Sequence, residues 1–222
     1  MSNYWMGDAP IPESAEKGSI RLVGDAVHSI CIPQHASGRA LPDFLRTEAS
    51  DRVLLGTDTY RRVLNGGNGI TWECEQPPVR FLMRDVQPVF TEEILRPLSE
   101  DLVTVNIVDA EMRVPTAASN IDQFAGNVLS RAKMSGANEL SWTLSDVQGA
   151  DNHSWILTSC FALRIDLRIE GISLPRSAFV RLGSSVVRNT CNKRVSAHLA
   201  DIRSAYELWA LEASTDDRDC AS

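Results

Sequence analysis

The 222-residue sequence has little of what identifies the common classes of enzyme and membrane protein. It has no Gly-rich phosphate loop followed by Lys and Ser or Thr, no HExxH zinc motif and no GxSxG nucleophile motif. The glycines of NGGNG at 65–69 are not followed by lysine and predict a turn. No apolar run approaches the roughly 20 residues of a transmembrane helix, and the first residues, which lack a basic start and an apolar segment, predict no signal peptide. These absences predict a cytosolic chain that binds no cofactor and no metal.

Cysteine is sparse, and charge is unevenly distributed. The five cysteines are scattered and none forms a CxxC pair, which predicts free thiols. The net charge is −7, yet residues 164–203 carry eight Arg and Lys against three Asp and Glu. This basic block predicts an anion-binding face, although a solvated surface gives the same pattern. Its candidate residues are Arg176, Arg181, Arg188, Lys193 and Arg194.

Alternating or β-branched segments predict a few strands. The clearest is 154–172, because apolar residues from Phe161 onward alternate with charged ones. Shorter strands are predicted at 70–74 and 102–108. Residues 19–33 also alternate, and Gly24-Asp25 in their middle predicts a hairpin with a tight turn.

Helical signals cover more of the chain. Asp43 predicts an N-cap for a helix that runs to about Leu55, and Thr91 predicts another N-cap with acidic residues behind it. Residues 113–140 are rich in Ala, Gly and Ser and predict a long, slim helix. The last helix has an apolar stripe at helical spacing, with basic residues at its start and acidic residues at its end. The stripe is Val195, Leu199, Ile202, Tyr206, Trp209 and Ala213.

These elements predict an α+β fold that is mainly helical. Its core is a helix bundle, accompanied by a small antiparallel sheet and extended terminal arms. We expect an N-terminal arm and hairpin over 1–40, a helical core over 41–163, and a C-terminal strand-helix extension with an acidic tail over 164–222. Slim helices suit subunits packed closely between neighbours, which predicts a self-assembling structural protein, a homo-oligomer that is not an enzyme.

One cluster offers an enzymatic alternative. His28, Cys31 and His35 could bind zinc or form a Cys-His nucleophile in a small cytosolic enzyme. On a strand, however, positions 28 and 31 point to opposite faces, and no fourth ligand stands nearby. A non-enzymatic interaction or adaptor module, using the basic C-terminal face, is the other alternative.

Several carboxylates are candidates for assembly contacts. Carboxylates of neighbouring subunits that are pressed together repel, so one of them keeps a proton and has a raised pKa. An assembly built on such pairs comes apart as the pH rises. The candidate residues are Glu92, Glu93, Asp109, Glu111 and Asp122.

Three blocks within about 79–160 resemble coat proteins of rigid rod-shaped plant viruses of the tobamovirus type. The first block is 79–98, with Val79-Arg80-Phe81, Asp85, Leu95 and Pro97-Leu98 at that family's spacing. The second contains Pro115-Thr116, Ala118 and Ile121-Asp122, and the third contains Gly149, Asn152, Ser154 and Ser159.

The resemblance implies a four-helix bundle with a small sheet, whose subunits stack helically around single-stranded RNA. It therefore implies a capsid protein found in a virion or in host cytoplasm, with no membrane partner. The family's arginine-bearing segment is replaced here by VTVNIVDAEM, which has no arginine. RNA phosphates would then be contacted by Arg113, Arg131 and Lys133, with 176–194 as a second choice.

Overall fold

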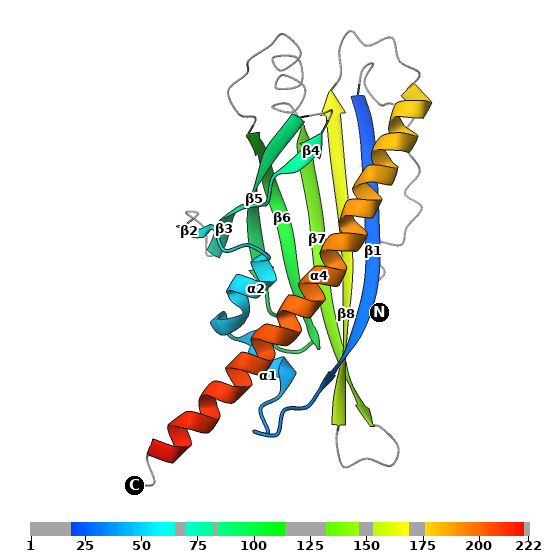
Figure 1. Cartoon of the computed structure of the whole chain (residues 1–222). Helices are drawn as coiled ribbons and strands as arrows, with labels where there is room; N and C mark the ends of the chain where they lie inside the picture. The colour runs from blue at the N-terminus through cyan, green and yellow to red at the C-terminus, as the bar shows by residue number, and fades with distance from the viewer. Residues whose placement is uncertain are drawn as a thin grey trace.

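One antiparallel sheet, crossed by one long C-terminal helix, dominates the computed structural model of the chain (Figure 1). The structure describes residues 19–64, 70–81, 84–113, 132–146, 153–168 and 176–219. The strands are β1 Ser19–Pro33, β2 Tyr60–Leu64, β3 Ile70–Glu75, β4 Val79–Phe81, β5 Arg84–Leu95, β6 Leu102–Arg113, β7 Lys133–Asp146 and β8 His153–Arg168. The helices are α1 Leu41–Arg46, η1 Glu48–Ser50, α2 Asp51–Leu55 and α4 Arg176–Asp219.

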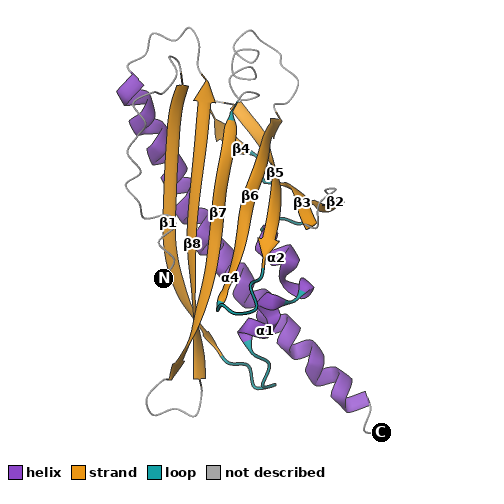
Figure 2. Cartoon of the chain, turned by 180° about the vertical axis from the view of Figure 1, so that it is seen from behind, coloured by secondary structure: helices purple, strands orange, loops and turns teal. Residues whose placement is uncertain are grey.

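The sheet has eight strands in the order β1-β8-β7-β6-β5-β3-β2, with β4 paired to β5 beside this path. Strands β5 to β8 follow one another as antiparallel neighbours. Strand β1 then pairs with β8, which brings the first and the last described strand of the sequence side by side. Helix α4 crosses one face of the sheet, and the view from behind shows the strands in front of it (Figure 2).

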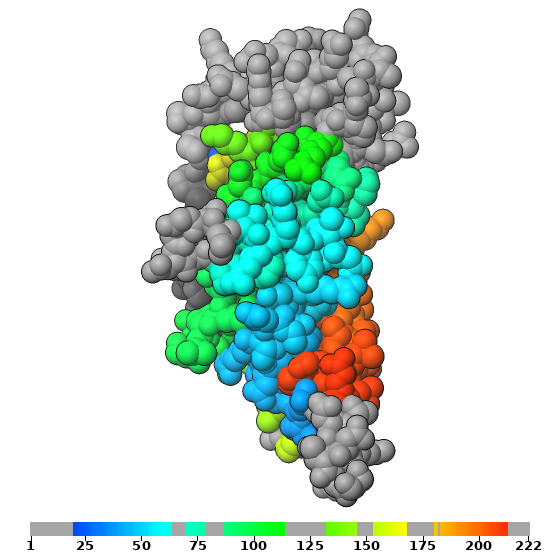
Figure 3. Space-filling view, turned by 90° about the vertical axis from the view of Figure 1, so that its left-hand side faces the viewer, coloured from blue at the N-terminus to red at the C-terminus, as the bar shows by residue number. Residues whose placement is uncertain are grey.

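The short helices lie at one end of the sheet, beside α4 (Figure 1). Figure 3 shows that the segment from α1 to β3 forms a continuous surface on this side, with the C-terminal half of α4 next to it. The ring centroids of Phe44 and Trp209 lie 5.6 Å apart. The Tyr206 hydroxyl donates a hydrogen bond to the Arg39 carbonyl at 2.7 Å, and the Arg39 guanidinium lies 4.4 Å from the Trp209 ring centroid. These contacts fix the C-terminal half of α4 against the rest of the chain.

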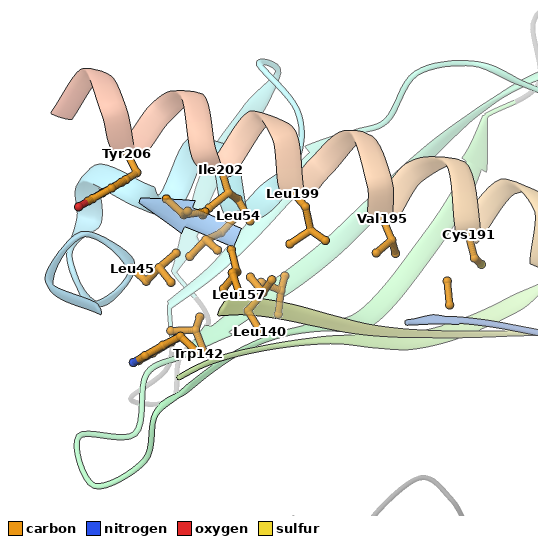
Figure 4. Close-up of a cluster of buried hydrophobic side chains, with 14 of the residues drawn as sticks. Leu45, Leu54, Leu140, Trp142, Leu157, Cys191, Val195, Leu199, Ile202 and Tyr206 are labelled. Carbon is orange, nitrogen blue, oxygen red and sulfur yellow. The ribbon is translucent and has the colours of Figure 1, made fainter. Parts of the chain in front are cut away.

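The main core lies between α4 and the sheet. Side chains of α4 point toward the strands at intervals of three or four residues, the spacing of one helical face (Figure 4). The buried residues of this stripe are Val187, Cys191, Val195, Leu199, Ile202, Tyr206 and Ala210. They pack against a cluster that includes Leu45, Leu54, Leu140, Trp142 and Leu157. None of the described helices combines the length and the apolar character that a membrane crossing requires.

The predicted mainly helical bundle with a small sheet is wrong, because the predicted helical core is largely sheet. Thr91 does not cap a helix, since 84–95 forms β5 between β3 and β6. Thr91 and the acidic residues after it suggest a helix. The segment is a strand because its backbone pairs with strands on both sides and every second side chain points into the core. Within the predicted slim helix, 133–140 belongs to β7, and 114–131 lies outside the described residues.

The hairpin predicted at Gly24-Asp25 is also wrong. All fifteen residues of β1 pair with β8 without interruption. Gly24 is buried within the strand and is not among the described glycines with positive φ. The predicted arm over 1–18 lies outside the described residues, and β8 runs continuously across the domain boundary expected at 163/164.

Other expectations are confirmed. Strands cover 70–74, 102–108 and the described part of 154–172. Helical segments occupy most of 43–55, although the N-cap is Ala40 and not Asp43. The predicted stripe of the last helix is buried at Val195, Leu199, Ile202 and Tyr206.

The real role of Gly24 is to let α4 approach β1. A Cβ at Gly24 would lie 2.7 Å from Val187 Cγ1 and 2.9 Å from the backbone nitrogen of Arg188. On the helix, a Cβ at Gly183 would lie 2.7 Å from Leu22 Cδ2. Two glycines, one on each element, therefore allow the backbones to come close where the N-terminal half of α4 meets the edge of the sheet.

We predict that Gly24→Ala destabilises the fold by about 1–3 kcal/mol, because the added methyl group overpacks a contact made by backbone atoms. Urea unfolding followed by circular dichroism measures this change. Val27→Ala, on the outer face of the same strand, is the control and should change stability little, since Val27 is 63% exposed. A Gly24→Ala variant as stable as the wild type would contradict the assigned contact.

Candidate functional site

A cavity of about 690 Å³ lies between the sheet and the N-terminal half of α4. Its floor comes from β5 to β8, and its roof from α4 residues between Gly183 and Asp201. The apolar floor residues include Phe90, Ile107, Met134, Phe161, Leu163 and Ile165. Most of the wall is therefore hydrocarbon.

The cavity exists because the inward residues of α4 change in size along the helix. Toward the C-terminus, Leu199, Ile202 and Tyr206 reach the sheet and fill the space. Toward the N-terminus, the α4 side chains that line the cavity are shorter, and they include Val187, Thr190 and Cys191. Such side chains do not span the gap between the helix and the strands, so that part of the interior stays open.

A β-bulge shapes the wall on the β5–β6 side. Thr91 pairs with Asp109, whereas Glu92 pairs with Ile107, so Val108 has no partner on β5. The extra residue shifts the alternation of β6, so that Ile107 before the bulge and Met112 after it both line the cavity.

Glu92 is the buried carboxylate of this wall, whereas Asp201, the other carboxylate that lines it, is exposed. The Glu92 side chain comes from an inward position of β5 and is only 4% exposed. The Cys74 thiol hydrogen-bonds to the carboxyl group, but Glu92 Oε2 has no hydrogen-bond partner among the described residues. Burial raises the pKa of Glu92 to about 7, and the nearby positive charge of Arg194 limits the increase. Burial beside Glu92 also raises the pKa of the Cys74 thiol, which keeps it protonated.

Arg194 reaches into the same region from α4. Its Nη2 donates a hydrogen bond to Gln76 Oε1, and its guanidinium lies 5.8 Å from the Phe90 ring centroid. Burial lowers the pKa of Arg194, and the charge of Glu92 opposes this effect. Because a guanidinium is only a donor, the bond fixes the Gln76 amide with its oxygen toward Arg194. Gln76 Nε2 is left buried without a described partner.

A second polar group is made by Asn138 and His198, which line the cavity, and by Ser159 behind Asn138. His198 Nε2 lies 2.6 Å from the Val53 carbonyl, which only accepts, so this nitrogen carries the proton. Burial lowers the pKa of His198 and favours the neutral ring, whose Nδ1 then accepts from Asn138 Nδ2 at 3.3 Å. The Ser159 hydroxyl donates to Asn138 Oδ1 at 2.6 Å. The three bonds hold Asn138 and His198 in one orientation at the cavity wall.

Of the predicted site residues that the structure describes, only two meet here. Arg194 was a candidate for RNA contact and Glu92 for assembly, yet both line the cavity. Arg113, the last residue of β6, forms ion pairs with Glu75 of β3 at 3.2 Å and with Glu111 of its own strand at 3.4 Å.

The other candidates are spread over the chain. Lys133, Arg181, Arg188 and Lys193 are exposed. Arg176 is the first residue of α4, Glu93 is half-buried in β5, and the carboxylate of exposed Asp109 accepts a bond from the Ala110 backbone. Arg131 and Asp122 lie outside the described residues. Self-assembly, the adaptor role and binding of single-stranded RNA are not tested by a single chain and stay predictions.

The structure does not bring His28, Cys31 and His35 together on one surface. His28 occupies an inward position of β1 and Cys31 an exposed outward one, as their spacing predicts. The His35 ring contacts Ser37 Oγ at 2.9 Å. No group of three or more potential metal ligands occurs within the described residues.

Sequence reasoning missed Cys74, Gln76, Asn138 and His198. A usable signal existed for Glu92, since Phe90, Glu92 and Ile94 alternate as inward positions do and a carboxylate among them is unusual. His198 carried a weaker signal, because it adjoins Leu199 on the inward side of the last helix.

Comparisons with known proteins give only distant likenesses. No protein-family model matches the chain, and no curated protein matches it significantly. Norcoclaurine synthase from Thalictrum flavum aligns at 10% identity and a TM-score of 0.39, over 88% of this chain and 89% of that one. The ZhuI aromatase/cyclase from Streptomyces sp. R1128 aligns at 9% identity and a TM-score of 0.35, over 85% and 93%.

A conserved protein from Geobacillus kaustophilus aligns at 7% identity and a TM-score of 0.40, over 86% of this chain and 97% of that one. Likeness at this level says nothing about what the present chain binds.

We predict that Glu92→Gln stabilises the protein increasingly as the pH rises. The folded pKa of about 7 lies above the unfolded value of 4.5, so the contribution of Glu92 is full below pH 4.5 and is lost as the pH rises through 7. Gln cannot ionise and does not incur this loss. Relative to the wild type, the variant should gain up to about 3 kcal/mol between pH 4.5 and pH 8.

Chemical unfolding at several pH values measures this difference. Glu48→Gln, at an exposed carboxylate of η1, is the control and should change stability little. A difference between Glu92→Gln and the wild type that stays constant over this pH range would contradict a buried carboxyl that titrates near neutrality.

Proposed function

We propose that this chain binds an elongated, mainly apolar small molecule in the cavity between α4 and the sheet. The observation that carries the proposal is a cavity of about 690 Å³ with mostly apolar walls and a few oriented polar groups. Small-molecule sites in proteins commonly measure about 300–1,000 Å³ and have this kind of wall.

The way in which α4 is held supports a preformed site. The glycine contact with β1 fixes its N-terminal half, and the aromatic and Arg39 contacts fix its C-terminal half. The helix thus bridges the cavity between two anchored regions. A ligand entering such a space does not have to order the walls first, which reduces the free-energy cost of binding.

The apolar wall also determines which kind of ligand the cavity binds best. A ligand that covers Phe90, Met134 and Leu163 removes apolar surface from water, which is the main source of affinity. The polar side chains gather in two places, around Glu92 and around Asn138, so they orient a ligand and do not solvate the whole space.

We predict that the wild-type protein binds N-phenyl-1-naphthylamine, a neutral apolar dye whose fluorescence rises in dry surroundings. Leu163→Trp should weaken this binding about tenfold, which corresponds to about 1.4 kcal/mol, because the indole occupies part of the cavity. Fluorescence titration measures both dissociation constants.

Cys160→Trp is the matched control, because it adds the same side chain to the exposed face of the same strand. It should leave dye binding unchanged. The proposal fails if the wild type does not bind the dye, or if both tryptophan variants weaken binding equally while remaining folded.

A further inference from the structure

The cavity wall contains a buried hydrogen-bond acceptor without a described partner. Glu92 Oε2 is enclosed, and the other polar contact of this carboxyl group is the Cys74 thiol. Buried polar atoms are normally hydrogen-bonded. Since Glu92 lines the cavity, a small rotation of its carboxyl group would present this oxygen to a donor on a bound molecule.

The charges around Glu92 determine what kind of donor fits. Arg194 faces Glu92 from α4. The other titratable group beside Glu92 is the Cys74 thiol on β3, which stays protonated and uncharged. Glu92 and Arg194 already pair one negative with one positive charge. A charged ligand group would be attracted by one of them and repelled by the other, so little net attraction would offset the loss of its hydration, and an uncharged donor suits the site best.

We propose that the cavity is specific for an uncharged, largely apolar molecule with a hydroxyl group that donates a hydrogen bond to Glu92 Oε2. The inference rests on the proposed function and adds the chemical class of the ligand. The hydroxyl donates to the carboxyl oxygen, and the apolar body of the ligand lies along Phe90, Ile107 and Met134. No covalent step is involved.

Gln76 provides a second, separate contact. Its backbone nitrogen donates to the Pro88 carbonyl at 2.8 Å, four residues before Glu92 along β5. Its unpartnered Nε2 therefore lies farther along the same wall and suits an acceptor oxygen elsewhere on the ligand. The wall thus presents an acceptor at Glu92 and a donor at Gln76 on one side of an apolar space.

The test is displacement of N-phenyl-1-naphthylamine by four probes of equal chain length. These are 4-heptylphenol, heptylbenzene, 4-heptylbenzoic acid and 4-heptylbenzylamine. For the wild type at pH 8, 4-heptylphenol should bind at least about tenfold more tightly than each of the other three.

Two variants of Glu92 separate recognition from folding. Glu92→Leu removes the acceptor, and the ratio between heptylphenol and heptylbenzene affinities should fall to near one while heptylbenzene still binds. Glu92→Gln retains an acceptor oxygen and should keep part of the preference. Glu48→Leu, at an exposed position, is the control and should leave the ratio unchanged.

The possible failures point to different conclusions. If all four probes bind equally well, or if Glu92→Leu leaves the preference for the phenol intact, hydroxyl recognition by Glu92 is wrong although the cavity still binds ligands. Tightest binding of the amine, lost in Glu92→Leu, would instead make Glu92 a cation site. If neither the dye nor any probe binds, both the proposed function and this inference fail.

Discussion

The packing of one helical stripe against one sheet determines most of this structure. Helix α4 has its inward residues at intervals of three or four, and these residues form the only broad apolar cover over the described strands. Large residues near its C-terminal half complete the core, whereas small ones near its N-terminal half leave a cavity. The same element thus supplies both the stability of the fold and the space in which a ligand can bind.

Buried polar groups in this structure divide into two kinds. In the chain Ser159–Asn138–His198–Val53, each link is a hydrogen bond that the structure describes, so the chain holds Asn138 and His198 rigidly at the cavity wall. Glu92 and Gln76, in contrast, each keep one enclosed atom without a described partner. Satisfied polar networks stabilise and orient, whereas unsatisfied atoms at a cavity wall are free to interact with an incoming molecule.

Strand and helix patterns in the sequence allowed part of the fold to be predicted. The alternation from Phe161 onward and the stripe from Val195 to Tyr206 were read correctly, because each is long enough to show its period clearly. The overall class was wrong, since acidic residues after Thr91 resemble a helix start and small residues after Lys133 resemble a slim helix. In both segments, pairing with neighbouring strands decides the conformation, and no local pattern reveals such pairing.

The site was less accessible to sequence reasoning than the fold. Glu92 and Arg194 are about a hundred positions apart, and they face each other only because α4 lies over the face of the sheet toward which Glu92 points. Gln76 and Asn138 look like ordinary polar residues until the sheet places them against the helix. A site made by tertiary contacts between a helix and several strands leaves no spacing motif in the sequence.

The paired glycines have a consequence for how the cavity could change. Gly24 of β1 lies against Val187, and Gly183 of α4 lies against Leu22. These two contacts fix the position of the helix along its own axis. If α4 slid along its axis by one residue, about 1.5 Å, a side chain would collide at one of the two glycine contacts. The length of the cavity therefore depends on which side chain of α4, counted from the N-terminal half onward, is the first to touch the strands. A longer ligand would be accommodated by shortening a side chain such as Val195 or Leu199, while the helix itself stays where it is.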